Sequence, residues 1–327
     1  MEGGRLGKVV ASGKKWKILV TPREACELLG TLPSGLRKRL ELFPTFGRVS
    51  DGNKLAMLLR DKDAVVLDLE HVTPEVFKGC HNLKIISRFG EGCDMIDISA
   101  AKNIGIRVAR TRGVGAKAVA RHALSLIMAM MHNTRENDRN MKRGVWVRKP
   151  NMSESASTLA VLGFGSIGRE VAELAYGFGF KVIVYSRRDH TDKRFVFVKD
   201  INKAVNMADV ISLHLPLTAE TKNLVSRRLL KQCKGKFIVN TARGALIDEC
   251  ALLDALNKDI IKGYATDVFL AEPVTGVSEK IARHPKVLCS PHVAAFDKAT
   301  AVNMTRRAVE NALHCLKNMH DKVVSYV

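Results

Sequence analysis

The stretch Thr158-Leu-Ala-Val-Leu-Gly163-Phe-Gly165-Ser-Ile-Gly168-Arg-Glu-Val-Ala172 decides the fold of this chain. An apolar strand runs into a turn with three spaced glycines, and a helix follows. Gly163 permits the tight turn, Gly165 lets the backbone approach a pyrophosphate, and Gly168 lets the helix pack close to the strand. The N–H groups that begin the helix face the anion. This order is typical of a dinucleotide-binding unit.

A second apolar strand, Lys181-Val-Ile-Val-Tyr185, follows that helix, so the order of the unit is strand, turn, helix, strand. The residue that ends the second strand selects the cofactor, because an acidic side chain there accepts hydrogen bonds from the adenosine ribose. Here that residue is Ser186, and Arg187 and Arg188 follow it. Two guanidinium groups without a carboxylate favour a 2′-phosphate, and therefore NADP(H) over NAD(H). The alternatives are a solvated basic loop and a loop in which Asp189 folds back.

Length and composition limit what surrounds this unit. With 327 residues the chain exceeds the usual size of one domain, so we expect two. A hydrophobic fraction of 46% is ordinary for a globular protein. The longest apolar run, Ala123 to Met131, is too short to span a membrane. Met1 to Lys15 is basic and lacks the apolar stretch of a secretory signal, so we expect a disordered lead-in.

The cysteines and the net charge indicate which compartment and which partners to expect. Seven cysteines without a Cys-x-x-Cys pair argue against a disulfide framework and against a zinc site, and predict a reducing, cytoplasmic compartment with no metal. The net charge of +20 attracts anions. Its one dense group is Arg135 to Lys149, and no nucleic-acid-binding module is evident. We rank attraction of small anions first, a solvated surface second and nucleic acid third.

Strands and helices alternate along the chain. We expect strands at 16–21, 64–69, 84–87, 210–215, 237–240, 263–268 and 287–290. We expect helices near 35–42, from Pro74 with Thr73 as the N-cap, over 116–142 and over 299–320. This alternation predicts an α/β fold with parallel, doubly wound sheets.

Polar residues follow three strands of the second half. Arg243, Glu272 and His292 each follow a different strand, and carboxyl ends of parallel strands share one edge of a sheet. Singly, Arg243 fits a phosphate clamp, Glu272 a surface carboxylate and His292 a satisfied polar residue. Together they suit hydride transfer between a nicotinamide and a 2-oxo acid, because a guanidinium binds the acid and an imidazole exchanges the proton.

From Ala64 onward the chain resembles the D-isomer-specific 2-hydroxyacid dehydrogenase family. Besides the glycine turn, the resemblance rests on residues 83–97, 208–221, 240–248 and Pro291-His292. It implies an oxidoreductase with two Rossmann-like, doubly wound parallel-sheet domains and an active-site cleft between them. It also implies a dinucleotide-binding domain at 116–295 and a discontinuous substrate domain at 1–115 with 296–327.

The resemblance assigns roles to single residues. Arg243 would bind the substrate carboxylate, His292 would be the acid–base catalyst paired with Glu272, and Gly90, Glu91 and Gly92 would bind the substrate. The cofactor-binding residues, including those of the turn and of the second strand end, would be Gly163, Gly165, Ser166, Ile167, Gly168, Ser186, Arg187, Arg188, Leu215, Pro216, Thr241, Ala242, Asp267, Ala294 and Ala295.

The chain departs from the family beside the substrate loop. Glu91 stands where an apolar residue is usual, and Arg110, Arg112 and Arg121 stand where the family has other residues. These arginines either bind a second anionic group on the substrate or neutralise Glu91 in an ion-pair cluster. We expect a small anionic 2-oxo or D-2-hydroxy acid, phosphorylated or phosphonylated under the first alternative.

Two expectations concern partners. The helix at 116–142 has more apolar positions than one domain face usually buries, which predicts a homodimer, unless the nucleotide domain itself covers the helix. The alternative function is a dinucleotide-sensing corepressor, because C-terminal-binding proteins share this fold and the same Arg, Glu and His. Ser186 argues against it, since such a protein would carry an acidic strand end.

Overall fold

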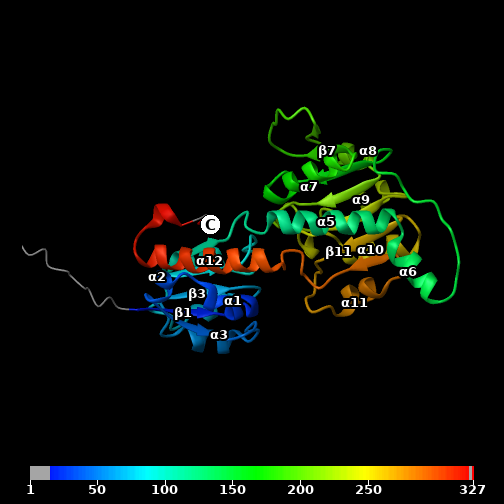
Figure 1. The fold of residues 1–327 in the computed structure, drawn as a ribbon. Helices are drawn as coiled ribbons and strands as arrows, with labels where there is room; N and C mark the ends of the chain where they lie inside the picture. The colour runs from blue at the N-terminus through cyan, green and yellow to red at the C-terminus, as the bar shows by residue number, and fades with distance from the viewer. Residues whose placement is uncertain (1–14, 324–325) are drawn as a thin grey trace, which may run out of the picture. The chain divides into compact units, whose positions relative to one another are not determined.

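The computed structural model describes residues 15–323 and 326–327, and Figure 1 shows the course of the chain. The chain divides into two compact units, Met1–Val114 with Ala301–Val327 and Gly115–Thr300, which we call unit 1 and unit 2. Residues 1–14 of the expected lead-in lie outside the described residues. Within the described part, no helix is long and apolar enough to cross a membrane.

Unit 1 is built on a parallel sheet in the order β2-β1-β3-β4-β5. Its strands are β1 (Trp16–Val20), β2 (Leu40–Pro44), β3 (Ala64–Leu67), β4 (Ile85–Arg88) and β5 (Arg107–Arg110). Its helices include α1 (Arg23–Leu28), α2 (Ser34–Arg37), α3 (Gly52–Leu59), α4 (Ile98–Asn103) and most of α12 (Lys298–Leu316). Every residue of β3 and β4 is buried, as expected for central parallel strands covered on both faces.

Helices cover the two faces of this sheet. Leu55 and Leu59 of α3 pack in one core cluster with Val65 and Ile86 of the central strands. The side chain of Ser87 points to the opposite face from that of Ile86. It donates a hydrogen bond of 2.8 Å to the backbone carbonyl of Ala308 in α12. Unit 1 is therefore doubly wound.

Unit 2 contains a parallel sheet in the order β12-β11-β10-β9-β6-β7-β8. Its strands are β6 (Thr158–Leu162), β7 (Lys181–Tyr185), β8 (Val196–Val198), β9 (Val210–Leu213), β10 (Phe237–Asn240), β11 (Gly263–Thr266) and β12 (Val287–Cys289). From β6 the chain adds strands first on one side and then, from β9, on the other. Ligands of open parallel sheets bind at the carboxyl ends of the strands at such a switch point.

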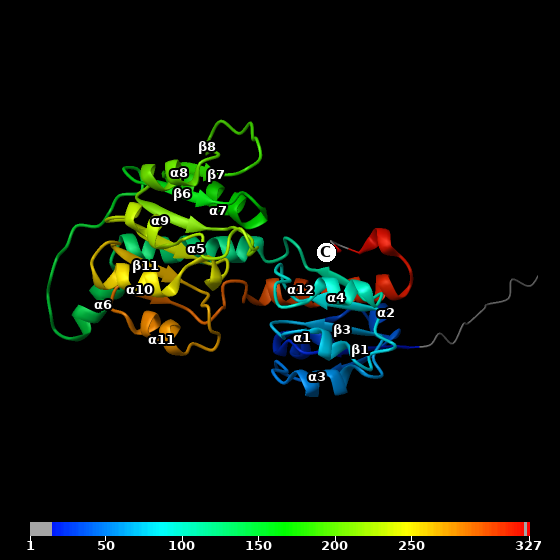
Figure 2. The same cartoon turned by 180° about the vertical axis from the view of Figure 1, so that it is seen from behind.

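Helices cover both faces of this sheet (Figures 1 and 2), and a hydrophobic cluster lies under each layer of helices. The helices are α5 (Ala116–Met131), α6 (Thr134–Lys142), α7 (Ser166–Gly177), α8 (Ile201–Met207), α9 (Arg227–Gln232), α10 (Glu249–Asn257) and α11 (Gly276–Arg283). Leu159 and Val161 pack with residues of α5 and α7, whereas Ala160 and Leu162 pack with residues of α8, α9 and α10. Alternate residues of β6 thus pack against the helices on opposite faces of the sheet.

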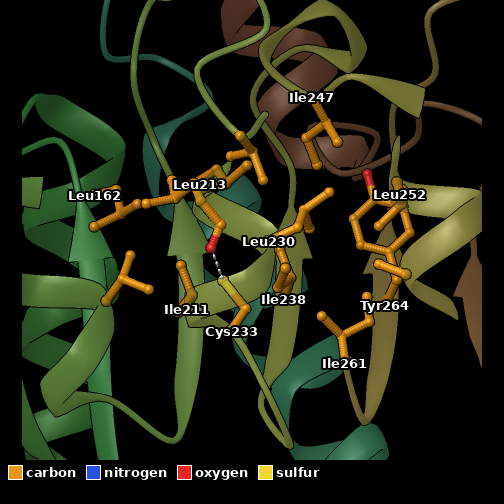
Figure 3. Close-up of a cluster of buried hydrophobic side chains, with 14 of the residues drawn as sticks. Leu162, Ile211, Leu213, Leu230, Cys233, Ile238, Ile247, Leu252, Ile261 and Tyr264 are labelled. Atoms are coloured by element: carbon orange, nitrogen blue, oxygen red, sulfur yellow. Dashed lines mark hydrogen bonds between the residues drawn. The ribbon is translucent and has the colours of Figure 1, made fainter. Parts of the chain in front are cut away.

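Figure 3 shows the second of these clusters. Leu162, Ile211 and Ile238 lie on neighbouring strands and contact side chains of the covering helices, among them Leu230. Cys233 donates a hydrogen bond of 3.3 Å to the carbonyl of Leu229, and burial raises the pKa of its thiol to about 12. Cys233 is therefore a residue of the hydrophobic core. All seven cysteines lie within the described residues and are free in the structure.

The helix expected over 116–142 is two helices. α5 ends at Met131, and Asn133 adopts the left-handed conformation with φ 50° before α6 begins. Asparagine is one of the few residues that tolerate this conformation. The buried apolar positions end at Met131, and α6 is polar and buries no residue, so the expected helix ran past the end of the apolar pattern.

Three further expectations differ from the structure. The stretch near 35–42 is helical only in α2, because Leu40–Pro44 pairs with β1 as an edge strand. The segment after Thr73 is a 3-10 helix, Pro74–Phe77, and the Thr73 side chain makes no capping hydrogen bond. β5 and β8, which are four and three residues long, were not expected from the pattern.

Candidate functional site

The glycine turn lies at the carboxyl end of β6. Gly163 has φ 105°, and a Cβ there would lie 2.5 Å from the carbonyl oxygen of His214. A Cβ on Gly168 would overlap the carbonyl oxygen of Gly163, so α7 can begin this close to β6 only with glycine. Nothing lies within 4 Å of a Cβ placed on Gly165. The turn is therefore packed against the protein at its first and third glycines and open at the second.

The helix that follows presents its N-terminus at this opening. Gly165 is the N-cap of α7 and offers no side chain to cap the first N–H groups, and Ser166 and Ile167 form the first helical positions. Both side chains are partly exposed. The N–H groups at a helix N-terminus and the positive end of the helix dipole are what a pyrophosphate needs.

Buried polar atoms on the neighbouring strands also fit a bound dinucleotide. Among the described residues, Nδ1 of His214 and Oγ1 of Thr241 have no hydrogen-bond partner, and they follow the adjacent strands β9 and β10. Burial lowers the pKa of His214 to about 3, so its imidazole is neutral. Buried polar atoms rarely stay unpaired, so these two call for a partner that the protein itself does not supply. Together with the open glycine turn, they fit the cofactor.

The end of β7 holds a small hydrogen-bonded group. Oγ of Ser186 lies 2.9 Å from Nε2 of His190 and accepts a hydrogen bond of 3.2 Å from the backbone N–H of Arg188. The imidazole of His190 stacks on Phe197, with ring centroids 4.8 Å apart. The sequence analysis did not single out His190. Its involvement depends on the loop turning back over four residues, which no spacing rule indicates.

Charged residues around this strand end are paired. Nη1 of Arg187 lies 3.0 Å from Oε2 of Glu220, and both side chains are exposed. Asp189 pairs with Lys199 at 2.7 Å, and this hydrogen bond lowers the pKa of the carboxyl group. The side chain of Asp189 therefore points toward Lys199, the residue that follows β8. The exposed Arg187–Glu220 pair contributes little stability and an anion can compete for the guanidinium.

The remaining predicted cofactor residues lie at the same edge of the unit 2 sheet. Leu215 and Ala242 are partly buried against the cluster of Figure 3. The carbonyl of Pro216 accepts a hydrogen bond of 2.6 Å from Thr221. Ala294 is buried and Ala295 is partly exposed. These residues follow β9, β10 and β12, so the structure places them on the strand ends where the sequence predicted them.

His292 and Glu272 form a pair. Nδ1 of His292 lies 2.8 Å from Oε2 of Glu272, whose other oxygen accepts a hydrogen bond of 2.9 Å from the backbone N–H of Phe269. Burial of Glu272 opposes ionisation, but the hydrogen bond and the charge of His292 prevail and lower the pKa of the carboxyl group. An ionised Glu272 accepts a hydrogen bond from the Nδ1–H of His292, which leaves Nε2 of His292 available to a substrate.

Arg243 lies in the same part of unit 2. It follows β10, and its charge is among the causes that lower the pKa of Glu272. A Cβ on the next residue, Gly244, would overlap the backbone of Phe269, so only glycine lets the turn after β10 lie so close to the turn after β11. The structure thus brings together Arg243, Glu272 and His292, the three predicted catalytic residues.

Asp267 anchors the segment that carries His292. Its side chain is 1% exposed and accepts hydrogen bonds from Oγ of Ser290 and from the N–H groups of Val293 and Ala294. Nε2 of His122, in α5, lies 2.9 Å from the same Ser290 oxygen. Sequence analysis did not find His122 as a member of this group. It precedes Ser290 by 168 residues in the chain, and only the fold brings the two together.

The predicted substrate loop lies in unit 1, after β4. The N–H of Gly90 donates a hydrogen bond of 2.9 Å to Oγ1 of Thr111, and the carboxylate of Glu91 accepts one of 2.8 Å from the N–H of Gly113. Arg110 donates to the carbonyl of Glu91 at 3.4 Å. Internal hydrogen bonds therefore hold the loop in place.

Beneath this loop lies a buried arginine that the sequence analysis did not find. Arg88 ends β4, is 5% exposed, and pairs with Asp68 at 3.1 Å. A Cβ on Gly90 would lie 3.1 Å from Nη1 of Arg88, so the loop passes directly over the guanidinium. Within the described residues, no group of three or more His, Cys, Asp or Glu side chains is placed to hold a metal ion.

Comparison with known proteins agrees with this geometry. Residues 124–294 match the family described as "D-isomer specific 2-hydroxyacid dehydrogenase, NAD binding domain". The chain is 35% identical to hydroxypyruvate reductase from Thermotoga maritima, over 79% of this chain and 85% of that protein. It is 40% identical to D-3-phosphoglycerate dehydrogenase 3 from Arabidopsis thaliana, over 72% of this chain but 41% of that protein. The crystal structure of the TT0316 protein from Thermus thermophilus has a TM-score of 0.80 at 30% identity, covering 92% of this chain and 97% of that one.

A parallel-sheet unit with an open glycine turn and a His–Glu pair at its strand ends defines a nicotinamide-dependent dehydrogenase. The chain belongs to the D-isomer-specific 2-hydroxyacid dehydrogenase family and is an oxidoreductase of D-2-hydroxy acids with an NAD-binding domain. The two-domain, Rossmann-like fold expected from the sequence is confirmed. The comparisons do not support the corepressor interpretation.

Proposed function

We propose that this enzyme interconverts a small 2-oxo acid and its D-2-hydroxy acid with NADP(H) as the favoured cofactor. The observation that carries the proposal is the 2.8 Å contact between His292 and Glu272 beside Arg243. In the direction of reduction, Arg243 binds the substrate carboxylate through its two parallel N–H groups. His292, oriented by Glu272, donates a proton from Nε2 to the carbonyl oxygen. The reduced nicotinamide, when bound, supplies the hydride.

The preference for NADP(H) is supported by the residues after β7. The residue that follows β7 is Ser186 and not a carboxylate, Arg187 and Arg188 come next, and Asp189 is paired with Lys199. Arg187 exchanges its exposed pairing with Glu220 for the 2′-phosphate at little cost. NAD(H) lacks this phosphate, so we expect it to be the less favoured cofactor.

The substrate is a small anionic acid. Two relatives are named hydroxypyruvate reductase and glyoxylate reductase, and the chain covers 85% and 80% of their length. We infer a substrate of the size of glyoxylate or hydroxypyruvate, whose carboxylate is bound by Arg243. Arg110, Arg112 or Arg121 would accept a second anionic group.

The experiment is a matrix of 2-oxo acids, with and without a phosphate or phosphonate group, assayed with NADPH and with NADH. We expect turnover of at least one small 2-oxo acid and a higher kcat/KM with NADPH. Oxidation of neither cofactor with any of the acids would refute the proposed reaction. A higher kcat/KM with NADH would refute the cofactor preference alone.

We also propose that the enzyme is a homodimer, on different grounds from those that the sequence suggested. The apolar face of α5 packs largely inside unit 2, so it does not itself call for a partner. The end of α6 and the segment after it do, because Met141 in α6 and Val145, Trp146 and Val147 after it are exposed, Trp146 to 77%. A second copy of the chain would cover them. Light scattering is expected to give twice the monomer mass, and Trp146→Ser to give monomer; a wild-type monomer at micromolar concentration would refute the dimer.

A further inference from the structure

A chain of hydrogen bonds leads from α5 to the buried carboxylate behind His292. Nε2 of His122 lies 2.9 Å from Oγ of Ser290, and that hydroxyl lies 2.5 Å from Oδ1 of Asp267. A carboxylate only accepts, so the Ser290 hydroxyl donates its proton to Asp267. Its oxygen is then left to accept, and Nε2 of His122 is the donor. The order His122 to Ser290 to Asp267 gives the direction of the chain.

Asp267 accepts hydrogen bonds from the backbone of His292 and of the two residues that follow it. Its carboxylate accepts the N–H groups of Val293 at 2.9 Å and Ala294 at 2.8 Å, and its backbone carbonyl accepts the N–H of His292 at 2.8 Å. His292 has φ 56°, in the left-handed region that non-glycine residues avoid. Such a conformation persists only where the surroundings fix it at several points. Asp267 supplies these points.

We propose that His122 is a positioning residue for His292 and acts through the Ser290 hydroxyl. A hydroxyl rotates freely among the acceptors around it. The hydrogen bond from His122 occupies the oxygen of Ser290, so the Ser290 hydroxyl stays directed at Asp267 and continues to donate to it. The Asp267 carboxylate is thereby held in the position where it accepts the backbone N–H groups of the turn that carries His292. The proposal rests on the catalytic role proposed for His292. It assigns the effect to the donated hydrogen bond, and not to a charge acting on Asp267 across the 3.7 Å that separates it from His122.

Variants at position 122 separate these two effects. Gln carries an amide nitrogen at about the reach of Nε2 and has no charge, Asn is one methylene too short, and Leu donates nothing. In steady-state assays of the full chain with NADPH and the best 2-oxo acid of the matrix, we expect His122→Leu and His122→Asn to lower kcat roughly 3- to 10-fold, as for the loss of one neutral hydrogen bond. KM for NADPH should change less than about twofold. His122→Gln should recover most of kcat; a Gln variant as slow as the Leu variant would overturn the proposal.

A double-mutant cycle tests the route through Ser290. Because His122 is proposed to act only through this hydroxyl, His122→Leu in the background of Ser290→Ala should cause no further loss of kcat. Additive losses would mean that His122 acts on Asp267 by another route, and would also overturn the proposal.

A measurement without substrate keeps the inference separate from the proposed reaction. The amides of Val293 and Ala294 report their hydrogen bonds to Asp267 directly, so their hydrogen exchange in the cofactor-free protein should speed up roughly 3- to 10-fold in His122→Leu and not in His122→Gln. Faster exchange in a protein that turns over no 2-oxo acid supports the positioning role while refuting the reaction. Unchanged exchange in His122→Leu refutes the positioning role.

Discussion

Nδ1 of His292 lies 2.8 Å from Oε2 of Glu272, and this contact fixes which imidazole nitrogen faces a substrate. Because the carboxylate accepts a hydrogen bond from Nδ1–H, Nε2 is the nitrogen that would exchange a proton with the carbonyl oxygen in the proposed reaction. Phe269 fixes the other oxygen of Glu272, so the carboxylate cannot rotate away without losing a second hydrogen bond. The orientation of the acid–base group is therefore set by the turn between β11 and α11.

Replacement of the imidazole should abolish most of the turnover. We expect His292→Ala to reduce kcat by about 10²-fold or more, since general acid–base catalysis contributes that much, while the dissociation constant of NADPH stays within about twofold. A matched control exists in unit 2, where His132 pairs with Glu154 at 2.6 Å. His132→Ala should leave kcat unchanged. Wild-type kinetics in His292→Ala would show that another residue carries the proton.

Glu272 should also be visible in the pH dependence of stability. Its pKa in the folded enzyme is lowered from the ordinary value of 4.5, because the hydrogen bond and charge of His292 outweigh burial. A lowered folded pKa contributes stability that is fully present above the unfolded value and is lost as the pH falls through the folded one. Glu272→Gln should therefore lower the melting temperature at pH 7, and this difference from wild type should shrink below about pH 4.5. A difference that stays constant down to pH 3 would contradict this interpretation.

The sequence allowed the dinucleotide unit to be predicted because glycine spacing and apolar strands are local signals. Gly163 and Gly168 act where any Cβ would meet backbone, so their positions alone reveal the turn. The break of the long helix occurs at the left-handed residue Asn133, where the apolar pattern also ends, and the expected bounds overran this local signal. His122 and Arg88 were missed for a different reason. Their roles come from neighbours on distant segments, and no spacing along the chain encodes such contacts.

Cofactor preference should change with the residue that ends β7. Ser186→Asp places a carboxylate beside the proposed 2′-phosphate site and should lower kcat/KM for NADPH relative to NADH roughly 10-fold or more, since a charge-assisted contact is worth about 1.5 to 3 kcal/mol. The control Ser226→Asp adds the same charge at the N-cap of α9 and should leave the ratio unchanged. An unchanged ratio in Ser186→Asp would place the phosphate elsewhere.

Arg243 should affect substrate binding as well as turnover. Arg243→Ala removes the charge and the paired N–H groups, so we expect a higher KM for the 2-oxo acid together with a lower kcat. Arg243→Lys keeps the charge without the planar geometry and should recover only part of the loss. Arg227→Ala, which breaks an ion pair with Asp254 on α10, serves as the control. A substrate KM that is unaffected in Arg243→Ala would remove this residue from the carboxylate site.

The arginines beside the substrate loop distinguish two substrate classes. If Arg110 or Arg112 binds a second anionic group, its replacement by Ala should lower kcat/KM for a phosphorylated 2-oxo acid at least about fivefold more than for glyoxylate. Arg110 already donates to the carbonyl of Glu91, so the competing role is structural and would lower the melting temperature and affect all acids alike. We expect the selective loss for at least one variant, with the exposed Arg37→Ala as the control. The same assay applies to Arg121→Ala in unit 2. Equal losses across the acids for all three variants would refute the second-anion site.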